Sequence, residues 1–296
     1  PARNAARGDR GFDREACVEC KIGGFDVVLC SDSRRIRTDF ASMYPRQAGS
    51  DFDPQRAIRI EVRKVGRSRL GRRLYQVYAE GEEISGPHPH DEVFPILEWG
   101  ISRRIIACRD EYLQCHAASL AHRGNGFIFA GDSGSGKSTL AAILLARGWQ
   151  YHCDEFALID RATLALHAFP KALCIKAGSY LLVKRLRLPL ARRHDHIKQS
   201  KGRVSYINPN DVRPGAVAGP TPVRYIVFPK YNGGTEPRLN PVSRAQAAMD
   251  LVRCCFNRHA MGEELLPILQ KLVSQCACFD LEVGEADATV DLLETA

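Results

Sequence analysis

The sequence lacks any apolar run long enough to cross a membrane. Among its 296 residues, no stretch approaches the roughly 18 apolar residues that a spanning helix needs. The first residues, PARNAARG, also lack the apolar core of a secretory signal. These two absences argue against membrane insertion and against export. We therefore expect a cytoplasmic protein without a membrane partner.

Internal repeats and low-complexity tracts are missing as well, which argues against solenoid and fibrous proteins. The composition, 45% hydrophobic and 26% charged, is that of an ordinary soluble globular protein. The net charge of +8, from 42 basic and 34 acidic residues, suits an anionic ligand such as ATP or an acidic partner. It is too diffuse to indicate nucleic acid, so we expect no nucleic-acid partner.

Complete zinc motifs are absent although the chain has eleven cysteines. Cys17-x-x-Cys20 and Cys276-x-Cys278 each lack a second pair at zinc-ribbon or zinc-finger spacing, and both lie in strand-like stretches. His88 and His90 lie among prolines and indicate a solvated turn. We therefore expect no metal held by these residues, and cysteines that are mostly reduced and packed.

The stretch GDSGSGKST matches the phosphate-binding loop pattern G-x-x-x-x-G-K-[ST]. Its glycines allow successive backbone N–H groups to converge on phosphate oxygens. Lys137 is spaced to reach the β- and γ-phosphates, and Ser138 to offer its hydroxyl to Mg²⁺. We expect the ATP phosphates to be held by Gly131, Asp132, Ser133, Gly134, Ser135, Gly136, Lys137, Ser138 and Thr139.

The residues on both sides of this loop fit the motif. Residues 126–130 form a short apolar run without alternation, typical of a strand buried on both faces. Residues 140–147 are apolar nearly all round, which predicts a buried helix that stops at Gly148. Strand, glycine loop and helix follow in the order that places a helix N-terminus at the anion.

The region before the loop divides into two parts. We expect residues 1–15 to be disordered and residues 16–88 to form a small β-rich accessory domain with no catalytic constellation. Its near period-two patterns lie at 25–30, 58–63 and 75–78, with a short helix or turn at 36–44. A linker is predicted at 85–90, and the catalytic domain at 89–296. The helix predicted at 92–108 is expected to pack on the nucleotide domain.

Two features flank the loop along the chain. The stretch LQCHAASL (113–120) predicts a strand or buried turn, and by composition its His116 is a core histidine. The turn at Gly124-Asn125-Gly126 would make this strand antiparallel to the one before the loop. After the loop, Asp154 and Glu155 stand between two strand-like runs. Such a pair can serve Mg²⁺ and an acceptor hydroxyl.

Basic residues follow the acidic pair. Lys176 ends a strand predicted at 169–176 and is either a phosphate contact or a surface lysine. A basic helix is predicted at 180–190. Residues 192–203 contain almost no apolar side chain and predict a mobile loop, either a lid over an acceptor or a solvated face. Further on, strands are predicted at 204–207, 223–228 and 278–283, and helices at 243–256 with a Ser243/Gln246 capping box, 263–273 and 285–293.

The ordered set of motifs resembles HPr kinase/phosphorylase and its relatives, most closely the HPr-kinase-related peptide kinases of lasso peptide gene clusters. The matching phrases run from about Ile36 onward: FPILEWG, LQCHAASL, GDSGSGKSTLAAILLARGW, DEFALID, the lysine of LCIK, IVFPKYNGG and PVSRAQA. The resemblance implies an α/β fold of the HPr-kinase and phosphoenolpyruvate-carboxykinase type, a P-loop domain with a mixed sheet, preceded by the small β-rich domain. A homo-oligomer is compatible with it.

The same resemblance implies roles for individual residues. Asp154 falls at the position of the catalytic base, Glu155 at a metal ligand beside Ser138, and His116 at an active-site histidine next to phosphate or carboxylate. Three departures stand against full equivalence. The second acidic residue is Glu155 where the family has Asp, the downstream Glu-Arg-Gly signature is not visible, and the catalytic arginine has only Arg203 and Arg213 as candidates.

We therefore expect an ATP- and Mg²⁺-dependent kinase with Asp154, Lys137 and His116 as catalytic residues and Lys176 as a further phosphate contact. The expected acceptor is a Ser or Thr hydroxyl of a peptide or small protein, and the resemblance favours the C-terminal serine of a lasso precursor peptide. The alternatives are a kinase for a small-molecule hydroxyl and a nucleotide-binding regulatory module without transfer.

Overall fold

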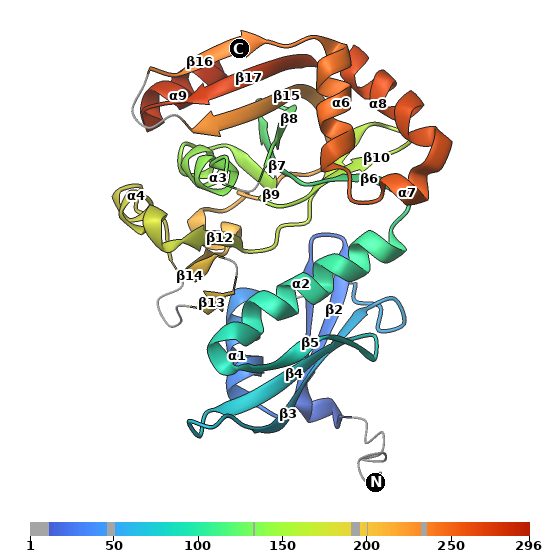
Figure 1. The fold of residues 1–296 in the computed structure, drawn as a ribbon, viewed down its shortest axis with the longest axis vertical. Helices are drawn as coiled ribbons and strands as arrows, with labels where there is room; N and C mark the ends of the chain where they lie inside the picture. The colour runs from blue at the N-terminus through green and yellow to red at the C-terminus, as the bar shows by residue number, and fades with distance from the viewer. Residues whose placement is uncertain (1–11, 46–50, 133, 191–195, 200, 232–235) are drawn as a thin grey trace. The chain divides into compact units, whose positions relative to one another are not determined.

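The computed structural model describes residues 12–45, 51–132, 134–190, 196–199, 201–231 and 236–296. The protein is α/β, with three mixed or antiparallel sheets and helices between them. It forms two compact units, the first running to Ile101 and the second from Ser102, with Ile22–Gly24 counted in the second (Figure 1). Of the disordered segment predicted at 1–15, residues 1–11 lie outside the described residues, and a short 3₁₀ turn, η1 (Arg14–Ala16), follows them.

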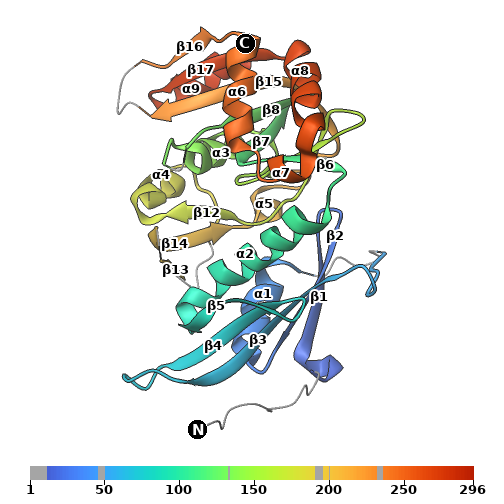
Figure 2. The ribbon, with the colours of Figure 1, turned by 45° about the vertical axis from the view of Figure 1, so that its right-hand side comes forward.

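The first unit is built on a five-stranded sheet with strand order β1-β2-β3-β4-β5. Burial alternates along its strands as expected of a sheet with one covered face, and the strands predicted from period-two patterns are confirmed. The parallel pair β2/β3 is joined through helix α1, and the remaining pairs from β3 to β5 are antiparallel (Figures 1 and 2). The elements are β1 (Cys17–Ile22), β2 (Phe25–Ser31), α1 (Arg34–Met43), β3 (Ile58–Arg67), β4 (Arg73–Ala79) and β5 (Glu82–Pro89).

The linker predicted at 85–90 is wrong. Residues 85–89 belong to β5, which pairs with β4 as far as Leu74 opposite Pro89, and His90 begins the next helix. Because β5 is the last strand in the order of this sheet, a proline there need not remove a ladder hydrogen bond. The histidines and prolines that suggested a solvated turn are therefore accommodated by an edge strand.

Helix α2 (His90–Cys108) confirms the predicted helix, but only its last part, Ser102–Cys108, is counted in the unit on which it was predicted to pack. Up to Ile101 it belongs to the first unit, where a side chain at Gly100 would meet Ile60, Ile84 and Ala79 of the sheet. The Tyr44 hydroxyl donates a hydrogen bond to Glu98 on the same helix. The spacing of apolar residues predicted the helix correctly, but the apolar side of its first part faces the β-rich sheet of the first unit.

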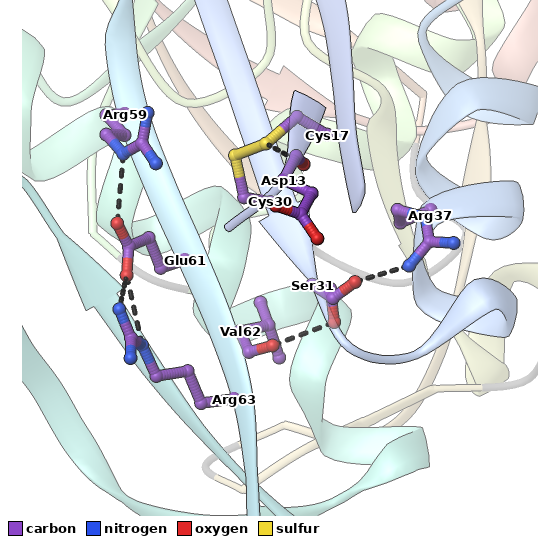
Figure 3. The surroundings of a disulfide bond; sticks show 9 residues. All are labelled: Asp13, Cys17, Cys30, Ser31, Arg37, Arg59, Glu61, Val62 and Arg63. Carbon is purple, nitrogen blue, oxygen red and sulfur yellow. Dashed lines mark hydrogen bonds and ion pairs between the residues drawn. A yellow bond between two sulfur atoms is a disulfide. The ribbon is translucent and has the colours of Figure 1, made fainter. Parts of the chain in front are cut away.

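A disulfide joins Cys17 on β1 to Cys30 on β2 (Figure 3). The other nine cysteines are free thiols, most of them buried, so the expectation of mostly reduced, packed cysteines holds with this one exception. Sequence spacing did not reveal the pair, because the two cysteines are brought together by the hairpin of β1 and β2.

The second unit contains a nine-stranded sheet in which β8 (Asn125–Ala130) is central. It pairs antiparallel with β7 (Ala117–His122) and parallel with β15 (Thr221–Tyr231), so the sheet is mixed. Arg123 and Gly124, with φ of 49° and 77°, form the two-residue turn of the β7–β8 hairpin. The predicted antiparallel neighbour is thus confirmed. The other strands are β6 (Tyr112–Cys115), β9 (Gln150–Cys153), β10 (Ala157–Asp160), β11 (Ala165–His167), β16 (Arg238–Pro241) and β17 (Ala277–Val283).

Both faces of this sheet are covered, as the continuous apolar run of β8 predicted. Phe127 and Phe129 pack into a cluster with α3 (Lys137–Ala146) and α9 (Ala286–Glu294), while Ile128 and Ala130 pack into another with α6 (Arg244–Cys254) and α8 (Leu265–Ser274). Ser243 caps α6 by accepting from the Gln246 backbone N–H. The Gln246 side chain bonds Asp250 instead, so only half of the predicted capping box forms.

Helix α3 ends where glycine was predicted to stop it. Gly148 has φ of 98°, and the backbone N–H of Trp149 donates to the Leu144 carbonyl. Arg213 completes this end: its guanidinium donates to the carbonyls of Leu145 and Trp149, each at 2.6 Å. Arg213 therefore lies at the C-terminal end of α3, about 15 Å of helix away from the end that faces the glycine loop.

A three-stranded sheet, β12-β14-β13, overturns part of the predicted loop at 192–203. Residues 192–195 and 200 lie outside the described residues, but β13 (His196–Lys198) pairs with β14 (Gly202–Ile207) as a hairpin, and β14 pairs with β12 (Leu173–Lys176). Polar composition misled the prediction because these strands are held by main-chain pairing. The helix predicted at 180–190 is shorter, α4 (Tyr180–Arg185), after the turn η2 (Ala177–Ser179).

Three short elements complete the unit: α5 (Pro209–Val212), α7 (Arg258–Met261) and η3 (Gly262–Glu264). Within the described ranges, none of the helices has both the length and the apolar character that crossing a membrane requires.

Candidate functional site

A cavity of about 680 Å³ opens in the second unit at the N-terminal end of α3. Its walls come from the glycine loop, the corner between β9 and β10, the end of β12, the β13–β14 hairpin and the start of α9. Its polar side chains include His116, Lys137, Ser138, Thr139, Asp154, Glu155, Lys176, Lys198 and Lys201. The sequence-predicted loop, acidic pair and histidine therefore come together at one place.

The glycine loop connects β8 to α3 and has the backbone that the motif requires. Gly134 and Gly136 have φ of 100° and 96°, which side-chain-bearing residues rarely adopt. Gly136 is the N-cap of α3, so the first N–H groups of this helix face the cavity without intrahelical partners. The helix dipole adds to the attraction for an anion at this position. Ser133 lies outside the described residues.

Lys137 is buried, and its ammonium group lies inside the curve of the loop. Its Nζ donates to the carbonyls of Gly131 at 2.6 Å and Asp132 at 2.7 Å, with the Ser135 hydroxyl at 3.5 Å. Burial lowers the pKa of Lys137. An ammonium has three donors, so two hold the loop in shape through short bonds, and the third makes only the long bond to the Ser135 hydroxyl, which an incoming phosphate could replace.

Ser138 and Thr139 follow at the first turn of α3, and both line the cavity. The Thr139 hydroxyl is 2.9 Å from that of Ser179, which ties the glycine loop to the opposite wall. Gly131, Asp132 and Ser135 shape the loop through the Lys137 contacts but are not among the described residues that line the cavity.

Asp154 lies directly after β9 and is buried at 4% exposure. Its Oδ1 accepts from the Tyr151 hydroxyl at 3.1 Å, and its Oδ2 from the Cys174 backbone N–H at 3.4 Å. Burial raises the pKa of Asp154 above its ordinary value, opposed by the nearby charge of Lys171. This carboxyl is therefore more basic than that of an exposed aspartate.

Glu155, the next residue, is in the opposite situation. Its carboxylate forms an ion pair with the buried Lys171 and has Lys198 at 3.9 Å on its other oxygen. The charge of Lys171 is the main reason that the pKa of Glu155 lies far below its ordinary value. Glu155 is therefore ionised near neutral pH.

Two adjacent carboxyls thus have pKa values that their surroundings push apart. Asp154 is raised by burial and Glu155 is lowered by Lys171. Such a separation distinguishes a group that exchanges a proton from one that keeps its charge. In this cavity the first can accept a proton and the second can hold a cation.

His116 lies between β6 and β7 and lines the same cavity. Its backbone N–H donates to the Cys254 carbonyl at 2.7 Å, and its ring meets Phe256 edge to face, with the centroids 5.5 Å apart. Burial and the charge of Lys137 lower the pKa of His116, so the imidazole is neutral near pH 7. The side chain is thus packed on one side, as composition suggested, and open to the cavity on the other.

Of the lysines, sequence reasoning named Lys176 and missed Lys171. Lys176 is exposed at the end of β12 and lines the cavity. Lys171 is 2% exposed and sets the charge state of Glu155. The available signal was a lysine inside the otherwise apolar stretch 169–175, because a buried lysine normally has a carboxylate partner.

Neither arginine candidate lies among the described residues that line the cavity. Arg213 caps the far end of α3, as described above, and the catalytic hypothesis for it is not retained. Arg203 is exposed on β14, where it pairs in register with Ile197.

The cavity suits a nucleotide and its magnesium ion. Within the part of the chain that the structure describes, no group of three or more His, Cys, Asp or Glu side chains could by itself hold a metal. Mg²⁺ on a nucleotide needs fewer protein ligands, because phosphate oxygens and waters complete its octahedron. Ser138 and Glu155 offer such hard oxygen donors in the same cavity, close to where the loop N–H groups would hold phosphates.

The charged half of the cavity adjoins an apolar half that includes Ile143, Leu182 and Val283. Backbone N–H groups at a helix N-terminus, an ionised carboxylate and a carboxyl of raised pKa lie in one cavity, and transfer of a phosphoryl group to a hydroxyl needs groups of these kinds. Comparison with known proteins gives no match, either to a family model or to a curated protein.

Proposed function

We propose that this protein is an ATP- and Mg²⁺-dependent kinase that transfers the γ-phosphoryl group to a Ser or Thr hydroxyl of a peptide or small protein. The observation that carries the proposal is the pair Asp154 and Glu155, with pKa values pushed apart, in one cavity with Lys137 and the glycine loop. A loop that merely binds a nucleotide does not need a buried basic carboxyl beside it.

In this proposal each residue has a task that its surroundings suit. The loop N–H groups and Lys137 hold the phosphates, and His116 offers a neutral N–H to a phosphate or carboxylate oxygen. Asp154 orients the acceptor hydroxyl and takes its proton as the O–P bond forms. Ser138 and Glu155 would hold Mg²⁺, which neutralises charge on the phosphates when bound. Lys176, Lys198 and Lys201 line the same space and add positive charge.

The fold proposed is that of the HPr-kinase and phosphoenolpyruvate-carboxykinase type. Support comes from the mixed sheet, in which the strand before the loop has an antiparallel neighbour on one side and a parallel one on the other. An all-parallel doubly wound sheet would not have this pair.

The acceptor we favour is the C-terminal serine of a lasso precursor peptide, in the cytoplasm. This choice rests on the sequence motifs quoted above. The net charge of +8 is compatible with an acidic peptide.

The deciding experiment is incubation of the full chain with Mg²⁺-ATP and a panel of Ser-terminated peptides, read by mass spectrometry for a phosphate adduct. Lys137→Ala and Asp154→Asn should fold and transfer nothing, while Arg213→Lys, which keeps the charge away from the cavity, should remain active. Phosphorylation of a hydroxylated metabolite with no modified peptide would show that the acceptor class is wrong. ATP binding without turnover on any acceptor would instead indicate a regulatory module.

A further inference from the structure

The connection between β3 and β4 in the first unit is strongly basic. Residues 63–73, here called the basic hairpin, contain six Arg or Lys and no acidic residue: Arg63, Lys64, Arg67, Arg69, Arg72 and Arg73. All of these except Arg63 are exposed. Two apolar side chains are exposed among them, Val65 at 49% and Leu70 at 89%.

Half of this charge is engaged by the protein itself. Arg63 pairs with Glu61, as Figure 3 shows, and Arg72 pairs with Asp91. The Arg67 guanidinium donates to the Gly71 carbonyl at 2.8 Å and so closes the turn. The other three cations, Lys64, Arg69 and Arg73, have no carboxylate within 4 Å in the described chain. Three positive charges of the basic hairpin therefore lie exposed without a carboxylate partner among the described residues.

The hairpin also has a strand edge that lacks a neighbour. Strand β2 ends at Ser31, which lies opposite Val62. From Arg63 to Arg67, β3 therefore has a partner strand on its β4 side alone, as far as the described residues go. The backbone N–H of Lys64 donates a hydrogen bond to the Asp32 carboxylate at 3.3 Å. The pairing of β3 on its β2 side ends at this point. Such an edge accepts an extended polypeptide.

We propose that the basic hairpin docks an extended acidic segment of a polypeptide. The cations supply attraction at long range, and the free edge of β3 supplies main-chain hydrogen bonds once the segment has arrived. The edge distinguishes a polypeptide from a nucleic acid or a lipid surface, because only a polypeptide carries the N–H and C=O groups that extend a sheet. That this segment belongs to the acceptor of the kinase rests on the proposed function; the docking surface itself does not.

Fluorescence anisotropy of a labelled Asp/Glu-rich peptide of about 12 residues, long enough to pass the hairpin, tests the proposal on the full chain without nucleotide. The variant Lys64→Gln/Arg69→Gln/Arg73→Gln removes three charges from the hairpin. Its matched control, Arg103→Gln/Arg238→Gln/Lys271→Gln, removes three exposed charges from other elements. We expect the hairpin variant to bind at least about tenfold more weakly and the control to bind as the wild type does.

Two further arms separate the chemistry. The same peptide N-methylated at alternate amides keeps its charge but loses the edge hydrogen bonds, and it should bind more weakly. A single-stranded oligonucleotide and anionic vesicles of matched charge should bind less well than the unmodified peptide. The proposal is overturned by equal loss in both variants, by tighter binding of the oligonucleotide or vesicles, or by no peptide binding at all. In the last case the charges serve only to keep β3 from pairing with other chains.

Phosphate transfer to an acceptor without an acidic segment, measured in parallel, keeps the two proposals apart. The hairpin variant should retain this transfer in full, since none of its residues lines the cavity. If the peptide does not bind but phosphate is transferred, only the docking proposal is wrong. If the peptide binds but no acceptor is phosphorylated, only the kinase proposal is wrong.

Discussion

Asp154 is the residue on which the proposed chemistry depends most. Because burial raises its pKa, its charged form is costly in the folded protein at neutral pH. Asp154→Asn removes that charge while keeping the side-chain shape. We expect transfer to fall about 10²–10⁴-fold, the range for loss of a general base, with a free energy of unfolding equal to or above that of the wild type. Urea unfolding beside the transfer assay checks both. Full activity in the variant would remove the role assigned to Asp154.

The pH dependence of both quantities has a defined sign. A carboxyl whose folded pKa is raised contributes stability that is present at low pH and is lost as the pH rises through that pKa. The stability advantage of Asp154→Asn should therefore grow as the pH rises toward neutral. Transfer by the wild type should increase over the same range, because the base must be ionised. A transfer rate that does not change as the pH rises toward neutral would contradict the role of Asp154 as the base.

Lys171 and Glu155 form the other informative pair. Lys171→Met leaves the Glu155 carboxylate with the more distant Lys198 and Lys201, and we expect the free energy of unfolding to fall by about 3 kcal/mol. The double variant Lys171→Met/Glu155→Gln should recover most of this loss, because neither charge is then left without its partner. A double-mutant cycle from chemical denaturation measures the coupling. Additive effects of the two changes would show that the ion pair contributes little.

How far the sequence predicted the site differs from residue to residue. The loop, Ser138 and the acidic pair could be named because their spacing along the chain is itself the signal. Lys171 could not be ranked above Lys176, because burial decides between them and burial is set by strands far apart in sequence. Arg213 looked as suitable as any arginine until the end of α3 accounted for its guanidinium.

At the scale of elements, α3 is held at both ends by different means. Glycine backbone and Lys137 shape its start, and Arg213 satisfies two carbonyls at its finish. Arg213→Ala should cost about 1–3 kcal/mol, as expected for hydrogen bonds to a charged group, while kcat per folded molecule stays unchanged. Arg213→Lys keeps the charge but has one nitrogen in place of the two that reach the two carbonyls, so its loss of stability should fall between zero and that of Arg213→Ala. Thermal unfolding with an active-site titration tests this, and a large drop in kcat would restore Arg213 as a catalytic candidate.

Elements were predicted best where apolar side chains mark a buried surface, which lies on both faces of β8, nearly all round α3, and on one side of α8 and β17. The failures share one cause, which is that main-chain pairing leaves little trace in composition. The β13–β14 hairpin begins in a polar stretch that gave no strand pattern, although His196 and the second half of β14 are buried. Strand β5 contains prolines because an edge strand tolerates them. The packing of α2 failed differently: its apolar stripe was visible, but not the sheet that it would cover.

At the scale of the whole molecule, the two tryptophans report on different units. Trp99 lies in the part of α2 that belongs to the first unit, and Trp149 is fully buried in the second. In the Trp99→Phe variant, the remaining tryptophan fluorescence should report the urea unfolding transition of the second unit alone. We expect Mg²⁺-ATP to shift this transition to higher urea, because a ligand stabilises only the unit that binds it. Far-UV circular dichroism of the same variant should show a further transition that does not move. One coincident transition by both probes would contradict independent units.

The central place of β8 in its sheet has a consequence for how the protein is made. On one side β8 meets β7 through a two-residue turn, so that pair can form as soon as both have left the ribosome. On the other side it waits for β15, which starts at Thr221, and β15 in turn waits for β17, which starts at Ala277. At roughly 5–20 residues per second, the glycine loop spends seconds in a nascent chain whose sheet is half built. Because Val283 at the end of β17 lines the cavity, we expect the nucleotide of the proposed kinase to be retained only by chains translated past β17.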